Sequence, residues 1–248
     1  MPDNSQRKSN SLKRLELPRR WEVLKDRAEA AEVDPKEIVE RVDRAADRVD
    51  KLMRRVRTGG GGVIEVIYGL SGSGKTTFLQ TLPKFFHGVR TEPFPKESPL
   101  TDLPDFILQN EIPGDERIRV VFIEERDIPK QSELQQVEEL FGDLLSVFRK
   151  SNGSVLVLWP ITRYDSAKQV ADSQTKGLYE FQGVSAERYW ALADNTSRTL
   201  NGDGLDAFGI THSRAMEILP QCRTITDFFD AIQGLADRNR DQTWSILK

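Results

Sequence analysis

The fold of this chain is decided by residues 63–77, which read VIEVIYGLSGSGKTT. The first six residues form a short apolar run that is typical of a buried β-strand. From Gly69 onward the stretch matches the pattern G-x-x-x-x-G-K-[ST] in full, and residues 76–86 have the composition of a helix. This order of strand, glycine-rich turn and helix is the context of a phosphate-binding loop. A chance match in a glycine-rich turn is the alternative, and the complete motif in its expected context weighs against it.

Each residue type in this loop has a physical reason to be there. Glycines let the backbone curl and approach phosphates closely, and the N–H groups of such a loop form a cradle for anionic oxygens. The start of the following helix adds the positive end of its dipole. The ammonium group of Lys75 reaches the β- and γ-phosphates, and the hydroxyl of Thr76 coordinates Mg²⁺. The residues expected to bind the nucleotide are Gly69, Leu70, Ser71, Gly72, Ser73, Gly74, Lys75, Thr76 and Thr77.

Strands and helices alternate after the loop and then give way to helices alone. Further strands are expected at 89–91, 119–124, 154–159 and 178–184. Helices are expected between them at 101–109, 131–150 and 165–175, and after them at 185–200, 213–219 and 226–237. This succession predicts an α/β fold: a three-layer domain with a mostly parallel sheet, followed by a small helical domain.

The segment before the loop is polar at first and then amphipathic. Residues 1–17 are expected to be disordered. A helix is predicted from about Trp21, and a second one begins with Asp34 as N-cap and Pro35 at its first position. Along the second helix, apolar residues alternate spacings of four and three: Ile38, Val42, Ala45, Val49, Leu52 and Val56. Two interpretations are open: a helix packed on the main domain, or a coiled-coil contact with a partner or a second copy.

Residues 59–62, four consecutive glycines, are the clearest break in the chain. The expected division is therefore 1–58 as a disordered start and amphipathic helical segment, 59–184 as the nucleotide-binding core, and 185–248 as a C-terminal helical lid.

Composition excludes several classes of protein. No apolar stretch approaches the ~20 residues that span a bilayer, and the N-terminus lacks the apolar core of a secretory signal. Cys222 is the single cysteine, so no intramolecular disulfide can form, and a reducing, cytoplasmic location is expected. The net charge is −3 overall, whereas residues 1–58 carry 16 Lys or Arg against 12 Asp or Glu. That basic segment permits a contact with nucleic acid or an acidic partner, although such mixed charge is usually a solvated helix face.

Hydrolysis requires a carboxylate that supports the metal ion and a group that orients water, at the end of a neighbouring strand. Glu124 and Glu125 follow the apolar run at 119–123 and are the candidates, with Glu124 near Mg²⁺ and Glu125 on the attacking water. The alternative is a pair of solvated carboxylates. Thr162, after the strand at 154–159, is the candidate sensor of the γ-phosphate. Arg163 could stabilise charge or form a surface ion pair.

With these motifs, residues 59–240 resemble the additional-strand P-loop ATPases of the AAA+ and signal-transduction type. GLSGSGKT resembles a Walker A motif and VVFIEE a Walker B motif, although Glu124 stands where the family usually has Asp. Thr162 resembles a sensor-1 residue, and Arg214 in THSRAMEIL is similar in placement to a sensor-2 arginine that contacts the nucleotide. The resemblance implies ATP as the nucleotide, five strands in the order 5-1-4-3-2 and a helical lid. Lys176 and Arg163 are the nearest candidates for an arginine finger.

Three functions are compatible with these features. The first is an ATPase that acts as a regulator or motor subunit and couples its nucleotide state to a macromolecular partner, either another protein or further copies of itself. The second is a small-molecule kinase, which would also use a phosphate-binding loop. The third is a nucleotide switch or scaffold that does not hydrolyse ATP and docks through the apolar seam of residues 38–56.

Overall fold

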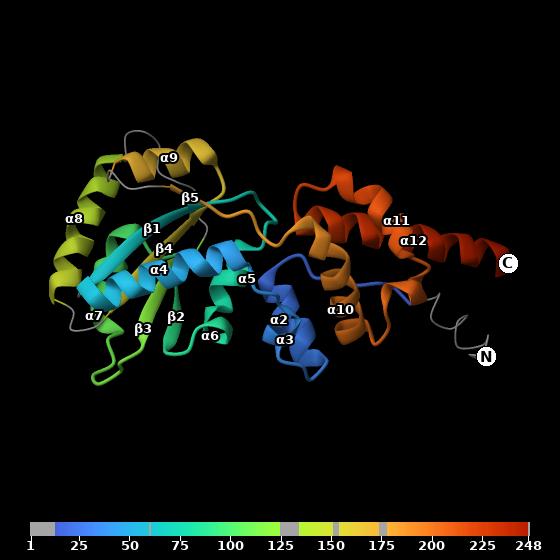
Figure 1. Cartoon of the computed structure of the whole chain (residues 1–248), viewed down its shortest axis with the longest axis horizontal. Helices are drawn as coiled ribbons and strands as arrows, with labels where there is room; N and C mark the ends of the chain where they lie inside the picture. Colours follow the sequence, from blue (N-terminus) through green and yellow to red (C-terminus); the bar gives the residue numbers. More distant parts are fainter. Residues whose placement is uncertain (1–12, 60, 125–133, 151–153, 174–177, 248) are drawn as a thin grey trace. The chain divides into compact units, whose positions relative to one another are not determined.

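A computed structural model describes residues 13–59, 61–124, 134–150, 154–173 and 178–247 of the chain (Figure 1). The chain divides into two compact units. The helical unit comprises Met1–Glu40, Gly72–Thr77 and Gly183–Lys248, and the sheet unit comprises Arg41–Ser71 and Phe78–Gln182. The segment 1–58, which the sequence sets apart, is therefore shared between the two units.

The sheet unit contains one five-stranded parallel sheet. Its strands are β1 (Gly62–Tyr68), β2 (Val89–Phe94), β3 (Ile118–Ile123), β4 (Val155–Ile161) and β5 (Leu178–Glu180). The strands lie in the order β2-β3-β4-β1-β5, and every neighbouring pair is parallel. This is the predicted order 5-1-4-3-2 read from the other edge, so the predicted α/β fold is confirmed. Every residue of β3 and β4 is buried, as expected for strands covered on both faces.

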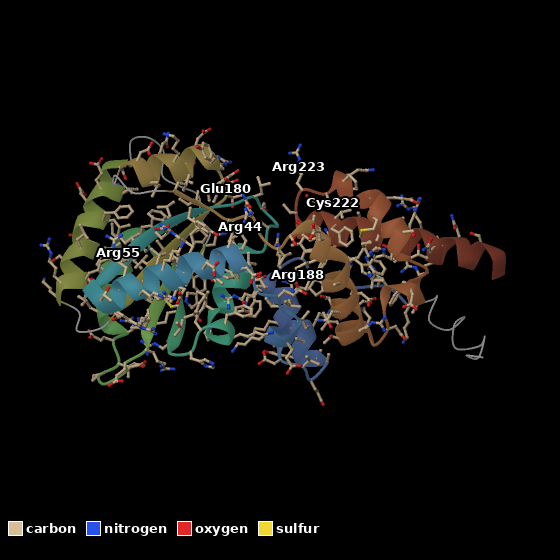
Figure 2. The ribbon with its side chains drawn as sticks, in the orientation of Figure 1. Arg44, Arg55, Glu180, Arg188, Cys222 and Arg223 are labelled. Atoms are coloured by element: carbon tan, nitrogen blue, oxygen red, sulfur yellow. The ribbon has the colours of Figure 1, made fainter. Side chains whose placement is uncertain are left out.

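Helix α4 (Asp43–Gly59) contacts β1 and β4 on one face of the sheet. Figure 2 shows Arg44 on this helix, where its Nη1 donates to Oε1 of Gln182 at 2.7 Å. The seam predicted from spacing is buried inside the chain, including Val49 and Val56 at 2% and 1% exposure. The helix is therefore packed on its own domain, and the coiled-coil interpretation of the seam is wrong.

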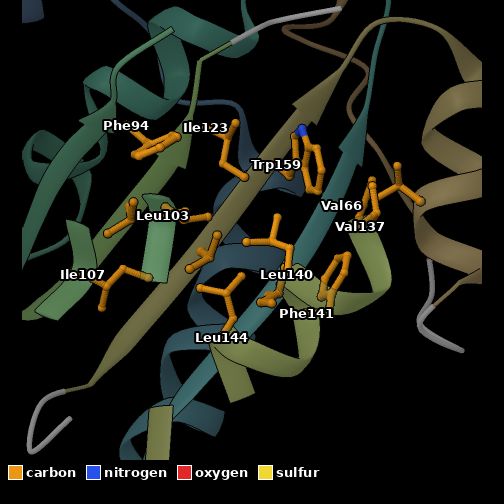
Figure 3. Packing of buried hydrophobic residues seen from close by; sticks show 14 of the residues in the cluster. Val66, Phe94, Leu103, Ile107, Ile123, Val137, Leu140, Phe141, Leu144 and Trp159 are labelled. Carbon is orange, nitrogen blue, oxygen red and sulfur yellow. The ribbon is translucent and has the colours of Figure 1, made fainter. Parts of the chain in front are cut away.

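The opposite face of the sheet carries an apolar core, which Figure 3 shows from close by. Helices α7 (Leu103–Gln109), α8 (Leu134–Lys150) and α9 (Tyr164–Asp172) contribute to it, and η1 (Leu100–Asp102) leads into α7. Alternate residues of the strands point into this cluster because side chains in a strand alternate between faces. The rings of Phe141 and Trp159 lie 6.2 Å apart between centroids.

Two predicted helices are broken in the structure. The helix expected from residue 34 to 56 is α3 (Pro35–Ile38) and then α4, with Val39 extended between them at φ −87° and ψ 135°. Ile38 is buried with Leu24 and Ala28 in the helical unit, whereas α4 belongs to the sheet unit. The helix expected at 76–86 is α5 (Lys75–Gln80) and α6 (Leu82–Phe85). Pro83 explains the second break, because proline has no N–H to continue the helical pattern.

The helical unit has its own apolar core. Its helices are α2 (Trp21–Ala30), α3, α10 (Tyr189–Asn201), α11 (His212–Ile218) and α12 (Ile225–Leu247), with short turns η3 (Ala186–Arg188), η4 (Leu205–Phe208) and η5 (Leu219–Gln221). Tyr189, Phe228 and Ile232 are buried at its centre. Among the described residues no helix is both long and apolar enough to cross a bilayer.

Residues 13–17 belong to this core, contrary to the disorder expected of them. Leu15 and Leu17 are each only 2% exposed. Nε2 of Gln233 donates to the carbonyl of Leu15 at 3.2 Å, and Asn201 exchanges two hydrogen bonds with the backbone of Glu16. These contacts tie the start of the described chain to helices near its end.

Candidate functional site

Three of the predicted site positions follow neighbouring strands of the sheet. Gly69 follows β1, Thr162 follows β4 and Glu124 follows β3, and these strands are adjacent and parallel. The backbone N–H of Gly69 donates to the carbonyl of Ile161 at 3.2 Å, which places the start of the loop beside the end of β4. The sheet therefore brings these three positions to one edge, the carboxyl edge, where open α/β sheets bind their ligands.

Thr162 has a buried hydroxyl without a partner. Its Oγ1 atom forms no hydrogen bond to any described residue. Buried polar atoms in proteins are nearly always paired, so a buried hydroxyl of this kind marks a place where a water or ligand is expected to bind. Next to it Arg163 is exposed and has no ion pair within the described ranges. Tyr164 packs edge-on against Tyr68, with ring centroids 5.3 Å apart.

Glu124 is the last described residue after β3. It is partly buried, and its N–H lies 3.5 Å from the carbonyl of Phe94. Glu125, the predicted water-orienting residue, lies outside the described residues, and so does Lys176.

The loop itself has the backbone expected of a phosphate cradle. Gly72 and Gly74 have φ angles of 78° and 91°, a backbone conformation that residues other than glycine rarely adopt. A Cβ atom on Gly74 would meet nothing within 4 Å, so its torsion and not crowding requires glycine there. Lys75 begins α5 and is buried, at 6% exposure. The Oγ atom of Ser73 is buried and unpaired with respect to the residues that the structure describes.

The peptide after Gly72 is held by the start of α12. The carbonyl of Gly72 accepts a hydrogen bond from Oγ1 of Thr226 at 3.1 Å and a longer one from its N–H at 3.4 Å. The next carbonyl of the loop, that of Ser73, lies close to Gly183. A Cβ atom built on Gly183 would be 2.6 Å from the carbonyl oxygen of Ser73. Sequence reasoning missed Thr226 and Gly183. The Thr-x-x-Asp pattern at 224–227 signals a helix start, but nothing local links it to a loop 154 residues earlier.

Arg214, the predicted sensor-2 residue, makes its contacts within and next to its own helix. Its N–H donates to Oγ1 of Thr211, the N-cap of α11, at 3.3 Å. Its guanidinium group pairs with Glu217 on the same helix at 2.5 Å, and both side chains are more than half exposed. Arg214 therefore forms a surface ion pair here.

The residues present fit a phosphate ligand. The positive-φ glycines, Lys75 and the hydroxyl of Ser73, which has no partner among the described residues, are groups of the kind that such a ligand needs. No group of three or more metal-ligating side chains occurs in the described part of the chain. Mg²⁺ in nucleotide sites is bound mainly by phosphates and water, with only one or two protein ligands, so a larger group of protein ligands is not required.

The chain resembles known proteins in its three-dimensional structure only. No family model matches the chain, and a search of the curated proteins found no match. The fold is similar to that of a chain in the E. coli MS115-1 HORMA:CdnC:Trip13 complex, with a TM-score of 0.51 and 12% identity over 79% of this chain and 76% of that one.

Two weaker likenesses are to Aeropyrum pernix ORC2 and to Drosophila ORC bound to DNA. Their TM-scores are 0.41 and 0.44, with identities of 13% and 16%. The match covers 78% of this chain and 61% of the ORC2 chain, and 96% of this chain and 73% of the Drosophila one. The likeness to a chain of the HORMA:CdnC:Trip13 complex concerns the fold alone, and it agrees with the parallel five-stranded sheet of this chain.

Proposed function

We propose that this chain binds ATP with Mg²⁺ through residues 69–77 and hydrolyses it, as an AAA+-like regulator or motor subunit. The observation that carries the proposal is the loop after β1, with positive φ at Gly72 and Gly74 and a buried lysine at position 75. A lysine at the start of the helix that follows a glycine-rich loop is suited to an anionic ligand, because its ammonium group and the N–H groups of the loop are all donors to phosphate oxygens.

Each residue has a role that follows from its chemistry. Lys75 would bind the β- and γ-phosphates, and Thr76 would hold Mg²⁺, which neutralises the charge that develops on those phosphates. Glu124 would support the metal through water, and Glu125 would orient or deprotonate the attacking water. The unpaired hydroxyl of Thr162 would bind the γ-phosphate or that water. Arg214 could join the nucleotide only after leaving Glu217.

The work that hydrolysis drives would pass through the helices of residues 185–248 to a protein partner or to further copies of the chain. Cytoplasmic location remains a prediction from the lone cysteine.

Binding and hydrolysis can be tested separately with purified protein. Lys75→Ala is expected to abolish binding of a fluorescent ATP analogue, whereas Glu125→Gln is expected to bind it and release phosphate at least about tenfold more slowly. Lys168→Ala is the matched control, because Lys168 is an exposed lysine paired with Asp172 at 2.6 Å on α9. ATP binding that is the same in Lys75→Ala and wild type would refute the proposal.

The same samples decide between the alternatives. Transfer of labelled γ-phosphate to a small acceptor would support a kinase. Tight ATP binding without turnover, even with a partner present, would support a switch. Such a switch would need another docking surface than the seam, because Val42, Val49 and Val56 are buried within the chain.

A further inference from the structure

We infer that Thr226 is a positioning residue for the phosphate loop: its contact with the Gly72 carbonyl turns the N–H of Ser73 toward the bound phosphates. This inference rests on the proposed function and adds to it a residue outside the motif. Both contacting segments belong to the helical unit.

The contact consists of two donors on one acceptor. Thr226 is the second residue of α12, and its Oγ1 and N–H both point at the carbonyl oxygen of Gly72, at 3.1 and 3.4 Å. The shorter bond comes from the side chain, so the hydroxyl contributes the larger share of the attraction.

Because of peptide geometry, this contact also fixes the direction of the Ser73 N–H group. A trans peptide is planar, and its carbonyl oxygen and N–H point in opposite directions. When the carbonyl of Gly72 faces α12, the N–H of Ser73 must therefore point to the other side of the loop. Among the described non-glycine residues only Glu32 has a positive φ, so Ser73, between Gly72 and Gly74, has a negative one. Alternation of this kind aims successive N–H groups at one anion.

The start of α12 is rigid enough to hold the loop. Oγ1 of Thr224 accepts from the N–H of Asp227 at 3.2 Å, and Oδ2 of Asp227 accepts from the N–H groups of Thr224 and Arg223 at 2.9 and 3.0 Å. This reciprocal arrangement is a capping box, which fixes the first turn of a helix. A Cβ on Gly72 would lie 2.7 Å from Cβ of Thr226, so the loop and the helix are in close contact.

The second carbonyl of the loop is confined as well. Gly183 has a φ of 75°, and a Cβ there would approach the Ser73 oxygen to 2.6 Å. The peptides on both sides of Ser73 are thus bounded by residues distant in sequence. Without the hydroxyl of Thr226 the first of them can rotate, and rotation would present a carbonyl oxygen to the phosphates in place of an N–H group.

The test compares Thr226→Val, which keeps the shape and removes the hydroxyl, with Thr226→Ser, which restores it. Affinities for ATP, ADP, inorganic pyrophosphate and adenosine are measured by calorimetry. Thr226→Val is expected to weaken the three phosphate ligands about five- to tenfold, the size expected for one lost hydrogen bond, and to leave adenosine unchanged. Thr226→Ser is expected to bind like wild type. Thr199→Val is the matched control, because the hydroxyl of Thr199 donates within its own helix, to the carbonyl of Asn195 at 2.9 Å.

Each outcome bears on the inference. Unchanged pyrophosphate affinity in Thr226→Val would overturn it, and so would equal weakening of adenosine, because that would indicate a general structural defect. Thr226→Ala is the second variant: if it and Thr226→Val both fail to fold while Thr199→Val folds, the residue is structural and the inference is wrong. If the wild-type protein binds none of the phosphate ligands, the proposed function itself is wrong. If the wild type binds them and Thr226→Val binds them equally well, only the inference about Thr226 is wrong.

Discussion

Nε of Arg48 donates to Oε1 of Glu65 at 2.7 Å, and this bond joins α4 to the strand β1. Glu65 is only 5% exposed, in the middle of the strand that leads into the phosphate loop. A buried carboxylate is tolerated because this guanidinium group is beside it. The pair thus supports the strand from which the candidate site begins.

Arg48→Met is expected to destabilise the protein by about 2 kcal/mol, because it leaves the Glu65 carboxylate buried without its charged donor. Urea unfolding measures the change. Arg54→Met is the control, since Arg54 pairs with Asp50 on the exposed side of the same helix. Its effect is expected to stay within about 0.5 kcal/mol. Equal losses of unfolding free energy in Arg48→Met and Arg54→Met would contradict the importance given to Glu65. The double variant Arg48→Met with Glu65→Gln is expected to recover part of the unfolding free energy that Arg48→Met loses.

Gly142→Ala in α8 and Gly234→Ala in α12 are expected to stabilise the protein by about 1 kcal/mol each, because alanine favours a helix over glycine. Both glycines are exposed, and a Cβ on either would meet nothing within 4 Å. Thermal unfolding of the single variants and of their combination measures the gain, which is expected to add because the sites are separate.

Gly62→Ala provides the contrast to those two helical glycines. A Cβ there would fall 2.2 Å from Cδ1 of Phe148, whose ring is buried. Overpacking of this kind is expected to cost about 1–3 kcal/mol. A neutral Gly62→Ala would mean that α8 moves away from β1 easily, contrary to the packing described for this core.

The ion pair of Asp115 with Arg117 is expected to make the stability of the folded chain fall at acid pH. Arg117 donates to both of its carboxylate oxygens, at 2.8 and 2.9 Å, and these bonds lower the pKa of Asp115 from 3.8 to about 2. The unfolded chain then binds a proton at higher pH than the folded one, so the contribution is complete above pH 4 and is lost as pH falls through 2.

Asp115→Asn is therefore expected to lose stability less steeply than wild type between pH 4 and pH 2, as measured by urea unfolding across that range. Arg117→Gln is expected to flatten the same limb, since it removes the cause of the lowered pKa. Curves that run parallel for all three proteins would show that this pair does not contribute to the acid dependence.

Cys222 is expected to react slowly with thiol reagents. It is half-buried, burial raises its pKa, and its Sγ lies 3.4 Å from the carbonyl of Ile218 (Figure 2). The thiolate is the reactive form, so a raised pKa lowers the rate at neutral pH. Ellman's reagent should modify one thiol per chain much faster in concentrated urea than in buffer. Equal rates would contradict the burial of Cys222 in the folded chain.

The sheet and the loop could be predicted because their signals are local. β3 and β4 are continuous apolar runs, and the loop residues form one contiguous motif. The edge that gathers Gly69, Glu124 and Thr162 follows from parallel strands whose carboxyl ends meet at the same side. The order of the strands came from the family resemblance, since the succession of elements alone does not fix it.

The remaining features depend on contacts between distant parts of the chain. The seam of α4 has the same spacing whether it faces its own sheet or another helix, so periodicity could not choose between them. Leu15 and Leu17 stand in a basic, polar stretch and become buried only because residues after 189 form their core. Thr226 carries no local sign of its contact with Gly72, and the chemistry of the motif does not require it.

The division of the helical unit among three separated segments has a consequence for the order of folding during synthesis. Leu15 and Leu17 leave the ribosome early, but the side chains that bury them, Phe228 and Ile232 among them, are synthesised more than 200 residues later. Translation proceeds at about 5–20 residues per second, so these leucines remain exposed for about 10 seconds or longer. The sheet unit can complete its strands by residue 180, before the helical unit can form. A chaperone that binds short apolar segments would find this one available throughout that interval.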